Sequence, residues 1–404
     1  MTIMEHKIPN GWQSKTVDEV SFVLKGRGLS KDKIDPLGKN KCILYGQLFT
    51  VYNEVIKRIK SKTDSNEGIV SQNGDILMPG STTTKAEDLA IASAILESDV
   101  LLGGDINILR KKDDIYDSVF LAYYLTHYKN NEISNFGQGI TIIHLYGRDI
   151  KKIKLILPPL SEQKKIAEIL FTVDEEINKT SEIILHTEKL KKGLIQDLFT
   201  KSLKSRKLKL KDIAQVTSSK RVMVSDYVSE GIPFYRSTEI IKKSKDLPVN
   251  NPLYISIEKF NFFKKHFGAP KKGDILITAV GTIGDVYMVK DEVFYFKDGN
   301  SVWIRKINDS VLSEYLRMML GSSFYRDKLN SIAGGSSQKA LTIQKLENVE
   351  IPIPSILEQK KLIEVISSVE SEVKKYNQIK DNLNKLKHGL VHDLLSGKVR
   401  VINK

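Results

Sequence analysis

Two stretches of this sequence occur twice, at one constant spacing. The run LPPLSEQKKIAEIL from Leu157 returns as IPSILEQKKLIEVI from Ile353, and LKKGLIQDLF from Leu190 returns as LKHGLVHDLL from Leu386. Both pairs lie 196 residues apart, and the alignment needs no gap. A repeat of this kind means that one structural unit is built twice, so the fold must accommodate two copies.

The two halves differ upstream of the repeated segments. There they agree only in pattern, as in NGDILM against KGDILI, and small gaps are needed. Each half is therefore a variable globular part of roughly 150 residues followed by a repeated segment of about 40. We expect a first globular domain at 1–157, a repeated helix at 158–200, a basic linker at 201–211, a second globular domain at 207–353, a second repeated helix at 354–397 and a tail at 398–404.

The repeated segments have apolar residues at steps of three and four, which predicts long amphipathic helices. Thirty-nine residues of helix, from Ser161 to Phe199, would span on the order of 58 Å, too far for one small core to bury. We expect the two helices to pair as an antiparallel coiled coil; the alternative is that each packs within its own half. The predicted seam residues are Ile166, Leu170, Val173, Leu190, Leu194 and Leu198 in the first helix and Leu362, Ile366, Val369, Leu386, Leu390 and Leu394 in the second.

The sequence predicts that the globular parts are α/β or α+β domains with short strands. The runs DILITAV from Asp274, VFYFK from Val293 and SVWIRKI from Ser301 have the residue types of strands. A helix is expected from Val119 in the first half and from Val311 in the second. With 41% hydrophobic residues the chain is able to build real cores.

The positive charge lies outside the repeated helices. The chain has a formal charge of +14, and the two helices contribute −2 and +1, which leaves +15 for the globular parts and the linker. Such an excess favours a polyanionic partner such as nucleic acid. A soluble basic protein without a polyanionic partner remains the alternative, and the basic linker either follows a phosphate backbone or is merely solvated.

Polar loops between the predicted strands carry hydroxyl, amide and guanidinium groups, which suit phosphate and base-edge contacts. For any single residue among them, a solvated turn is the competing interpretation. The candidate DNA-binding residues are Lys25, Arg27, Tyr45, Gln47, Ser81, Thr82, Thr83, Thr84, Lys85 and Gln138 in the first half and Lys220, Arg221, Tyr235, Arg236, Thr278, Thr282, Ser336, Ser337, Gln338 and Lys339 in the second. Because GQGITIIH (137–144) stands where the second half has GGSSQKAL (334–341), we expect Ser336 to Lys339 to lack a counterpart.

Motifs of catalysis are missing from the sequence. NPLY at 251–254 lacks the second proline of an amino-methyltransferase loop, GTIGD at 281–285 is not a GxGxxG fingerprint, and no GxxxxGK[ST] run occurs. His388 and His392 stand four apart, but no third ligand accompanies them in sequence. We therefore expect no catalytic residues, no metal and no cofactor.

The chain also offers few signs of export. A single cysteine, Cys42, makes no intramolecular disulfide, the start MTIMEHKIPN has no apolar core, and the apolar stretch from Ala90 to Leu102 is interrupted by Glu97 and Asp99. We expect a cytoplasmic protein without a membrane-spanning segment.

Taken together, the tandem repeat resembles the specificity subunit of type I restriction-modification enzymes. The resemblance rests on the EQKK runs after prolines, on the LKxGLxxDL endings and on DILM and DILI. It implies two target-recognition domains that each read half of a gapped duplex DNA site, an antiparallel coiled coil that sets the gap, docking of two methyltransferase subunits, and addition of restriction and translocase subunits. By resemblance the docking framework includes Glu162, Gln163, Lys164, Glu358, Gln359 and Lys360 together with the seam residues.

Three other functions stay open at this point. A coiled-coil scaffold that binds no DNA, or another kind of bipartite DNA-binding protein, fits the repeat and the helices. A stand-alone DNA-modifying enzyme with degenerate motifs is the third possibility, and it requires methyl transfer by the chain alone.

Overall fold

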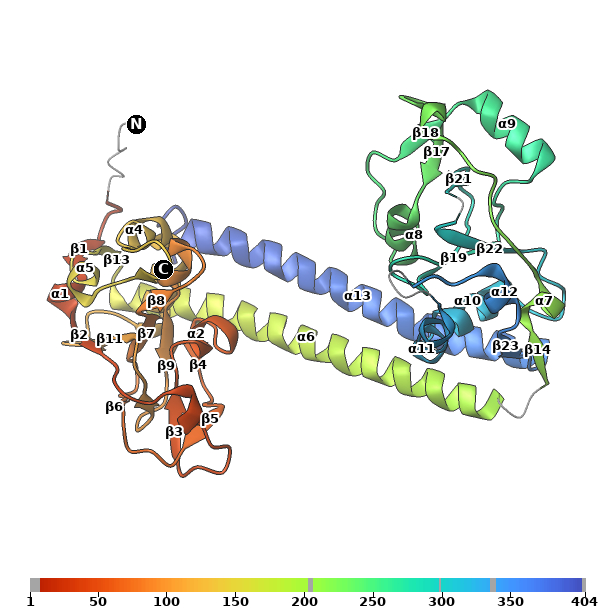
Figure 1. Cartoon of the computed structure of the whole chain (residues 1–404). Coiled ribbons are helices and arrows are strands. Elements are labelled where there is room, and N and C mark those ends of the chain that lie inside the picture. The colour runs from red at the N-terminus through yellow and green to blue at the C-terminus, as the bar shows by residue number, and fades with distance from the viewer. Residues whose placement is uncertain (1–7, 203–205, 298, 335–338, 402–404) are drawn as a thin grey trace. The chain divides into compact units, whose positions relative to one another are not determined.

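The computed structural model describes residues 8–202, 206–297, 299–334 and 339–401, without the side chains of 198–202. The chain divides into two compact units. Unit 1 combines Met1–Ser181 with Gln378–Lys404, and unit 2 is Glu182–Asn377. Each unit thus contains one globular part together with a piece of both long helices (Figure 1).

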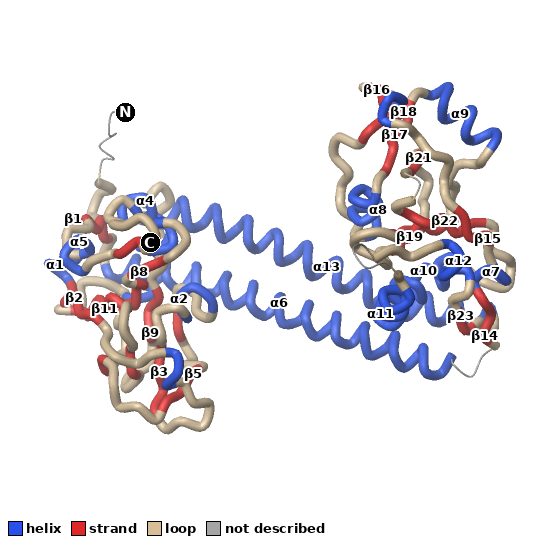
Figure 2. Tube along the Cα trace, viewed as in Figure 1, coloured by secondary structure: helices blue, strands red, loops and turns tan. Residues whose placement is uncertain are grey.

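Unit 1 is built mainly from short strands joined by loops (Figure 2). The strands are β1 (Gln13–Thr16), β2 (Ser21–Lys25), β3 (Asn40–Ile43), β4 (Val55–Ile56), β5 (Ser61–Thr63), β6 (Ile69–Val70), β7 (Ile76–Pro79), β8 (Ser81–Thr82), β9 (Ser93–Ile95), β10 (Leu101–Leu102), β11 (Ile106–Lys111), β12 (Ile143–His144) and β13 (Lys154–Leu157). The short helical elements are α1 (Val17–Val20), η1 (Lys31–Lys33), α2 (Gln47–Thr50), η2 (Ala86–Ala90), α3 (Ser118–Tyr123), η3 (Tyr124–Tyr128, a π-helical turn), α4 (Asn130–Ser134) and α5 (Gly147–Ile150).

The main sheet of unit 1 has the strand order β2-β11-β7-β9-β4, and a second sheet has the order β5-β3-β10-β6. Their strands are short, and all four residues of β7 are buried. Ile76, Phe120 and Leu121 share one hydrophobic core with Ile166 and Leu394 of the long helices. The globular part of unit 1 is therefore packed directly on the helix pair.

Unit 2 repeats this plan with different strands. They are β14 (Lys207–Lys209), β15 (Gln215–Thr217), β16 (Tyr227–Val228), β17 (Ile232–Tyr235), β18 (Leu253–Ile255), β19 (Ile275–Thr278), β20 (Val286–Met288), β21 (Tyr295–Phe296), β22 (Ser301–Arg305) and β23 (Glu350–Pro352). The helices are α7 (Leu210–Ile213), η4 (Val224–Asp226), α8 (Ser237–Ser244), α9 (Ile257–His266), α10 (Ser313–Gly321), α11 (Ser323–Ile332) and α12 (Ile343–Glu347). The sheets have the orders β15-β22-β19-β20 and β16-β18-β17-β21.

The same frame closes both globular parts. β1 pairs antiparallel with β13 in unit 1, and β14 pairs antiparallel with β23 in unit 2. A short helix follows each first strand, α1 after β1 and α7 after β14. Thr16 and Glu19 form a capping box at the start of α1, because each side chain accepts from the other's backbone N–H group.

The predicted basic linker at 201–211 is shorter in the structure. Residues up to Ser202 belong to the helix α6, and Lys207–Lys209 donate and accept in the β14–β23 ladder. A strand at the edge of a domain satisfies its backbone groups there, so residues 207–211 are part of unit 2. Residues 203–205 lie outside the described part of the chain.

The two long helices are α6 (Leu160–Ser202) and α13 (Ile356–Leu395). They run antiparallel within each unit: in unit 1 Ile166 and Leu170 share a core with Leu394 and Leu390, and in unit 2 Lys191 pairs with Glu370. The antiparallel coiled coil and the α+β class are thus confirmed.

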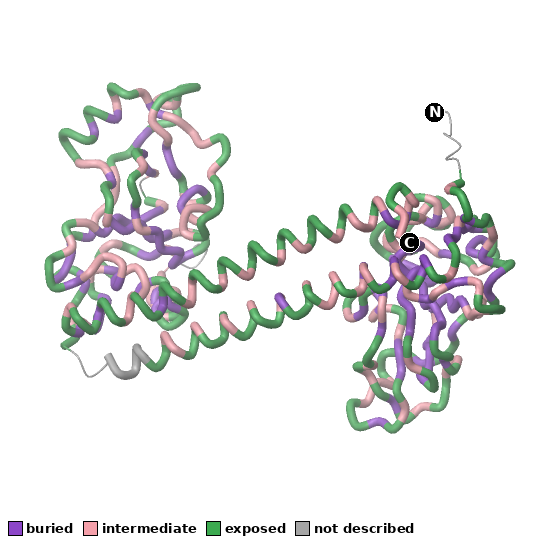
Figure 3. The backbone as a smooth tube through the Cα atoms, turned by 180° about the vertical axis from the view of Figure 1, so that it is seen from behind, coloured by how far each residue is buried: buried purple, intermediate pink, exposed green. Residues whose placement is uncertain are grey.

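The middle of each long helix is largely exposed (Figure 3). Ile166, Leu170, Ile366 and Leu394 are buried, and Val173, Leu194, Leu362, Val369 and Leu390 are half-buried. Leu190 and Leu386, predicted in the seam, are 56% and 50% exposed, so those two predictions are wrong. Two helices alone cover only one narrow stripe of each other, and every other face stays open to solvent or to a partner.

Most of the expected elements are present. DILITAV contains β19, VFYFK contains β21 and SVWIRKI contains β22, while α3 and α10 begin within two residues of the expected starts. Within the described residues, no helix combines the length and the apolar character that crossing a bilayer requires.

Candidate nucleic-acid interface

A β-hairpin occupies residues 138–144 of unit 1. The N–H of Gln138 donates to the carbonyl of His144 at 3.0 Å, and the N–H of His144 donates back at 2.8 Å. The returning arm, β12, pairs with β8, and Leu145 N–H donates to the Gly80 carbonyl at 2.9 Å. The hairpin is thus fixed to the end of the buried strand β7.

In unit 2 a backbone pair, Gly334 with Ala340, lies at the same place in its sheet. Gly334 and Ala340 exchange backbone hydrogen bonds of 3.1 and 2.8 Å, and Leu341 N–H donates to the Ala279 carbonyl at 2.8 Å. Ala279 follows β19 as Gly80 follows β7. The expectation that a DNA role of Ser336 to Lys339 lacks a counterpart in the first half stays a prediction. Ser336, Ser337 and Gln338 lie outside the described residues, and Lys339 is exposed.

The residue beside this backbone pair has a negative charge in unit 1 and a positive charge in unit 2. In unit 1 the buried carboxylate of Asp149 accepts from Gln138 Nε2 at 3.1 Å and pairs with Lys152 at 2.8 Å, and these contacts lower its pKa, the bond from Lys152 most of all. The repeat places Lys345 at the equivalent position in unit 2. Its Nζ is so near Gly334 that a Cβ there would approach it to 2.7 Å. The residue next to the equivalent loop is thus an acid in unit 1 and a base in unit 2.

Several predicted contact residues gather around the hairpin of unit 1. Thr83, Thr84 and Lys85 are exposed on the loop after β8. Lys25 lies 3.5 Å from Asp105, and the hydroxyl of Ser81 donates to the same carboxylate. The structure thereby brings Lys25, the exposed residues 83–85 and Gln138 into one surface, which presents amide, hydroxyl and ammonium groups suited to DNA.

Other candidates of unit 1 lie elsewhere. Tyr45 is exposed beside α2, with its ring edge-on to Phe49. Gln47 is half-buried and already engaged, because Leu44 N–H donates to its Oε1 at 2.9 Å and its Nε2 donates to Ser61 Oγ at 2.6 Å. Arg27 is exposed on the loop after β2.

In unit 2 a basic and aromatic surface forms around α9. Lys220 is exposed, and its ammonium lies 5.1 Å above the ring of Phe267; the neighbouring Arg221 is also exposed. Phe262 on α9 is 54% exposed and adjoins Phe267. The run NFFKKHF at 261–267, which mixes aromatic and basic residues, is the signal that was missed in the sequence.

Four candidates turn out to be buried. Thr278 is fully buried and its hydroxyl accepts from Asp285 N–H at 3.0 Å, while Tyr235 stacks on Phe294 with ring centroids 4.5 Å apart. Ser81 and Thr82 are buried in the β8–β12 pair. All four side chains are buried, so the prediction that they contact DNA at the surface is wrong, and they instead stabilise the fold.

The remaining predicted contact residues of unit 2 are on the surface. Thr282 is exposed in the turn between β19 and β20. Arg236 is exposed but pairs with Glu239, with 2.8 Å between Nη2 and Oε1.

The EQKK runs place one glutamine at the start of each long helix. Gln163 Nε2 donates to the carbonyls of Ile115 and Pro158 at 3.1 and 2.8 Å, and its Oε1 accepts from Asp117 N–H at 2.9 Å. Gln359, its repeat-mate, makes the same three bonds to Ser310, Pro354 and Leu312 at 2.8, 2.9 and 2.8 Å. Both side chains are fully buried, so each glutamine fastens a helix to its globular part.

The neighbours of these glutamines differ in accessibility. Glu162 is buried against Arg400, 2.8 Å away, whereas Glu358 caps the start of α13 through Ser355. Lys164 and Lys360 are exposed. Of the predicted docking residues, Lys164, Lys360, Glu358, Leu190 and Leu386 are exposed, so a partner subunit is able to reach them.

A second repeated pair crosses between the helices. In unit 1 Lys387 of α13 lies 2.8 Å from Asp174 of α6 and 3.3 Å from Glu54. In unit 2 Lys191 of α6 lies 2.8 Å from Glu370 of α13, which also receives Arg317 at 3.3 Å. Sequence reasoning missed both pairs, although LKK and LKH contain their lysines. Burial opposes ionisation of Glu54, but the bond with His127 and the charge of Lys387 prevail and hold its pKa at about 2.

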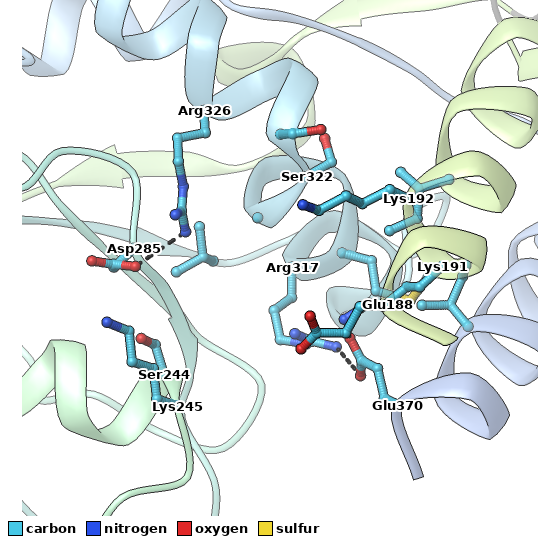
Figure 4. A pocket seen from close by; sticks show the side chains of 16 residues that line it. Glu188, Lys191, Lys192, Ser244, Lys245, Asp285, Arg317, Ser322, Arg326 and Glu370 are labelled. Carbon is cyan, nitrogen blue, oxygen red and sulfur yellow. Dashed lines mark hydrogen bonds and ion pairs between the residues drawn. The ribbon is translucent and has the colours of Figure 1, made fainter. Parts of the chain in front are cut away.

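A polar cavity of about 510 Å³ lies in unit 2 beside this pair (Figure 4). Lys191 and Lys192 of α6 line it together with Arg317, Arg326 and Asp285. Arg326 reaches Asp285 at 3.1 Å, and Arg317 and Lys191 share Glu370. The cations outnumber the carboxylates, so the cavity is suited to anionic groups. Among the described residues, no three His, Cys, Asp or Glu side chains are placed to hold a metal ion.

Comparison with known sequences gives one family. The family described as "Type I restriction modification DNA specificity domain" matches residues 9–186 and again 204–385. The MjaVIII specificity subunit of Methanocaldococcus jannaschii is 25% identical over 84% of this chain and 82% of its own. A putative type I restriction enzyme specificity subunit of Haemophilus influenzae is 29% identical over 76% of this chain and 78% of its own.

Solved structures share the fold. The S subunit of a type I restriction-modification system from M. genitalium has a TM-score of 0.62 and 18% identity, covering 96% of this chain and 97% of its own. A chain from a study of complex assembly in a type I restriction-modification system has a TM-score of 0.59 and 17% identity, with 97% and 100% covered.

Proposed function

Since the chain belongs to the family of type I restriction-modification DNA specificity domains, we propose that it reads a DNA target in two separate parts, one with each unit. The chain is a non-catalytic specificity subunit. Unit 1 reads one half-site and unit 2 the other, and α6 with α13 sets the gap between them.

One observation carries this proposal: the hydrogen bonds that fasten each long helix to its globular part are the same in the two units, while the loops differ. Gln163 and Gln359 make the same three hydrogen bonds, whereas Gln138 of unit 1 bonds to Asp149 and the equivalent position in unit 2 is Lys345, close to Gly334. Sites that grip the same partner must stay alike, whereas sites that read different sequences must differ. The pattern of equality and difference therefore matches two identical partners and two unequal half-sites.

The partners follow from the framework. We infer that two methyltransferase subunits dock on α6 and α13, which present exposed side chains such as Leu190 and Leu386 at repeated positions. Restriction and translocase subunits would join that complex, which acts on double-stranded DNA in the cytoplasm, where the genome lies.

We propose that the exposed cations and hydroxyls of the two globular parts contact the duplex. In unit 1 these are Lys25, Arg27, Tyr45, Thr83, Thr84, Lys85 and Gln138, and in unit 2 they are Lys220, Arg221, Arg236, Thr282 and Lys339. The lysines and arginines would mainly hold phosphates, and the amide and hydroxyl groups are suited to base edges.

The test is to map methylated bases after co-expression with the methyltransferase subunits of the same genome. We expect one asymmetric motif with two defined parts and an undefined gap of fixed length. Exchanging residues 207–353 for the equivalent part of another specificity subunit should change one half-site and leave the other unchanged. A single uninterrupted motif, or a change in both parts after the exchange, would contradict the proposal.

A further inference from the structure

The most exposed apolar side chain of unit 1 stands at the tip of hairpin 138–144. Ile140 is fully exposed and Ile142 is 47% exposed. Isolated apolar residues on a surface are common, but these two isoleucines lie on one short loop and together form a small apolar projection.

The backbone holds this tip in a single shape. Gly139 has φ +134°, and a Cβ there would meet the Ile142 carbonyl oxygen at 1.9 Å. At the base, Gly137 leaves no room either, since its Cβ would come within 2.8 Å of Ile143. Together with the Gln138–His144 hydrogen bonds, these contacts make the hairpin a preorganised support, which lowers the entropic cost of binding.

The surroundings of the tip are suited to a polyanion. Arg148 lies 3.5 Å from Asp149, yet its side chain is 70% exposed and its guanidinium lies 5.1 Å over the ring of Tyr146, which is itself exposed. Lys85 is exposed on the neighbouring loop, and the nearby carboxylates of Asp105 and Asp149 already pair with Lys25 and Lys152. An apolar tip flanked by cations matches a DNA groove, where phosphates meet the cations and an apolar side chain is able to enter between bases.

We propose that Ile140 is a wedge that enters a base step of the half-site read by unit 1 and partly unstacks it. This rests on the proposed function. The equivalent sequence in unit 2, between Gly334 and Ala340, is GSSQK and contains no large apolar residue. The distortion is therefore confined to one half-site, and readout there includes how easily the step deforms.

The test uses the chain assembled with its methyltransferase subunits and duplexes that carry the mapped target with 2-aminopurine at successive steps. Because methyltransferases extrude their target base, which raises 2-aminopurine fluorescence by itself, the probe is placed only at steps away from the methylated bases. At those steps the wild-type complex should raise the fluorescence once in the unit 1 half-site and nowhere in the other. Ile140→Ala should abolish that rise and weaken binding of the target about tenfold, the effect of losing one buried isoleucine contact. Leu37→Ala, at a leucine that is 90% exposed elsewhere in unit 1, is the matched control and should change neither.

Other results overturn the inference. Unchanged fluorescence and affinity in Ile140→Ala would exclude a wedge while leaving the proposed function standing. If Ile140→Ala instead released the methyltransferase subunits and left the fluorescence response intact, the tip would be a protein contact. A wild-type complex that bound neither the target nor a mixed-sequence duplex would overturn the proposed function as well.

Discussion

The ammonium of Lys387 lies 2.8 Å from the carboxylate of Asp174, and the repeat places Lys191 at the same distance from Glu370. The two pairs have different surroundings. Lys387 also pairs with a second carboxylate, Glu54, and the side chains of Lys387 and Asp174 are less than one-fifth exposed. Glu370 instead pairs with a second cation, Arg317, and the side chains of Glu370 and Lys191 are about one-third exposed. The repeated contact therefore joins one cation to two carboxylates in unit 1 and one carboxylate to two cations in unit 2.

Replacing the two lysines should therefore have unequal effects. Lys387→Met leaves two largely buried carboxylates without their cation, and we expect a loss of about 3 kcal/mol in the free energy of unfolding. Lys191→Met removes a more exposed pair whose carboxylate keeps Arg317, so the expected loss is below about 1 kcal/mol. Urea unfolding of both variants measures the difference, and equal losses would refute this account.

The lowered pKa of Glu54 predicts how the free energy of unfolding changes as the pH falls. Its pKa in the folded protein is about 2, below the ordinary 4.5, so its contribution is fully present above pH 4.5 and disappears as the pH falls through 2. The contribution is about 3 kcal/mol. Unfolding measured from about pH 5 to about pH 2 should show this loss in the wild-type chain and a smaller slope in Glu54→Gln. The same slope in both proteins would mean that Glu54 is not the group responsible.

The paired glutamines should respond alike. Gln163→Ala and Gln359→Ala each strand a buried backbone N–H group and two carbonyl groups, for an expected loss of about 3 kcal/mol in either case. Gln344→Ala, at an exposed glutamine, should change stability by less than about 0.5 kcal/mol. Thermal unfolding with a probe in each unit provides the comparison. A loss confined to one variant would show that the repeated bonds are not equivalent in energy.

Lys85 should contribute through a phosphate. Lys85→Gln is expected to weaken binding of a mixed-sequence duplex and to reduce the slope of log K against log salt by about 0.9. Lys179→Gln removes an exposed lysine of α6 that pairs with Glu176, far along the helix from the loops, and should leave the slope unchanged. Titrations of the assembled complex at several salt concentrations decide the matter, and identical slopes for Lys85→Gln and the wild type would remove Lys85 from the interface.

The framework could be predicted from the sequence because its signals are local or repeated. Prolines before the long helices, apolar steps of three and four, and a constant offset identify α6 and α13. The exposed positions of Leu190 and Leu386 could not be foreseen, since a heptad pattern does not reveal how many partner helices cover it.

The candidate interface was harder to predict, because loop side chains are placed by tertiary contacts. Ser81, Thr82, Thr278 and Tyr235 have the residue types of a DNA-contacting loop, yet strand pairing and ring stacking bury them. Conversely, the match between hairpin 138–144 and its counterpart in unit 2 depends on backbone bonds to Gly80 and Ala279, which the dissimilar sequences GQGITIIH and GGSSQKAL conceal.

The division of the chain into units has a consequence for its synthesis. Unit 2 is one continuous segment, Glu182–Asn377, whereas unit 1 needs Gln378–Lys404 to complete its core with Leu394 and Leu395. During translation, unit 1 is therefore completed only after unit 2 has been made, since Leu394, Leu395 and the Arg400 that pairs with Glu162 follow Asn377 in the sequence. A chain that stops after Asn377 would contain all of unit 2 and would lack the part of α13 that completes the core of unit 1.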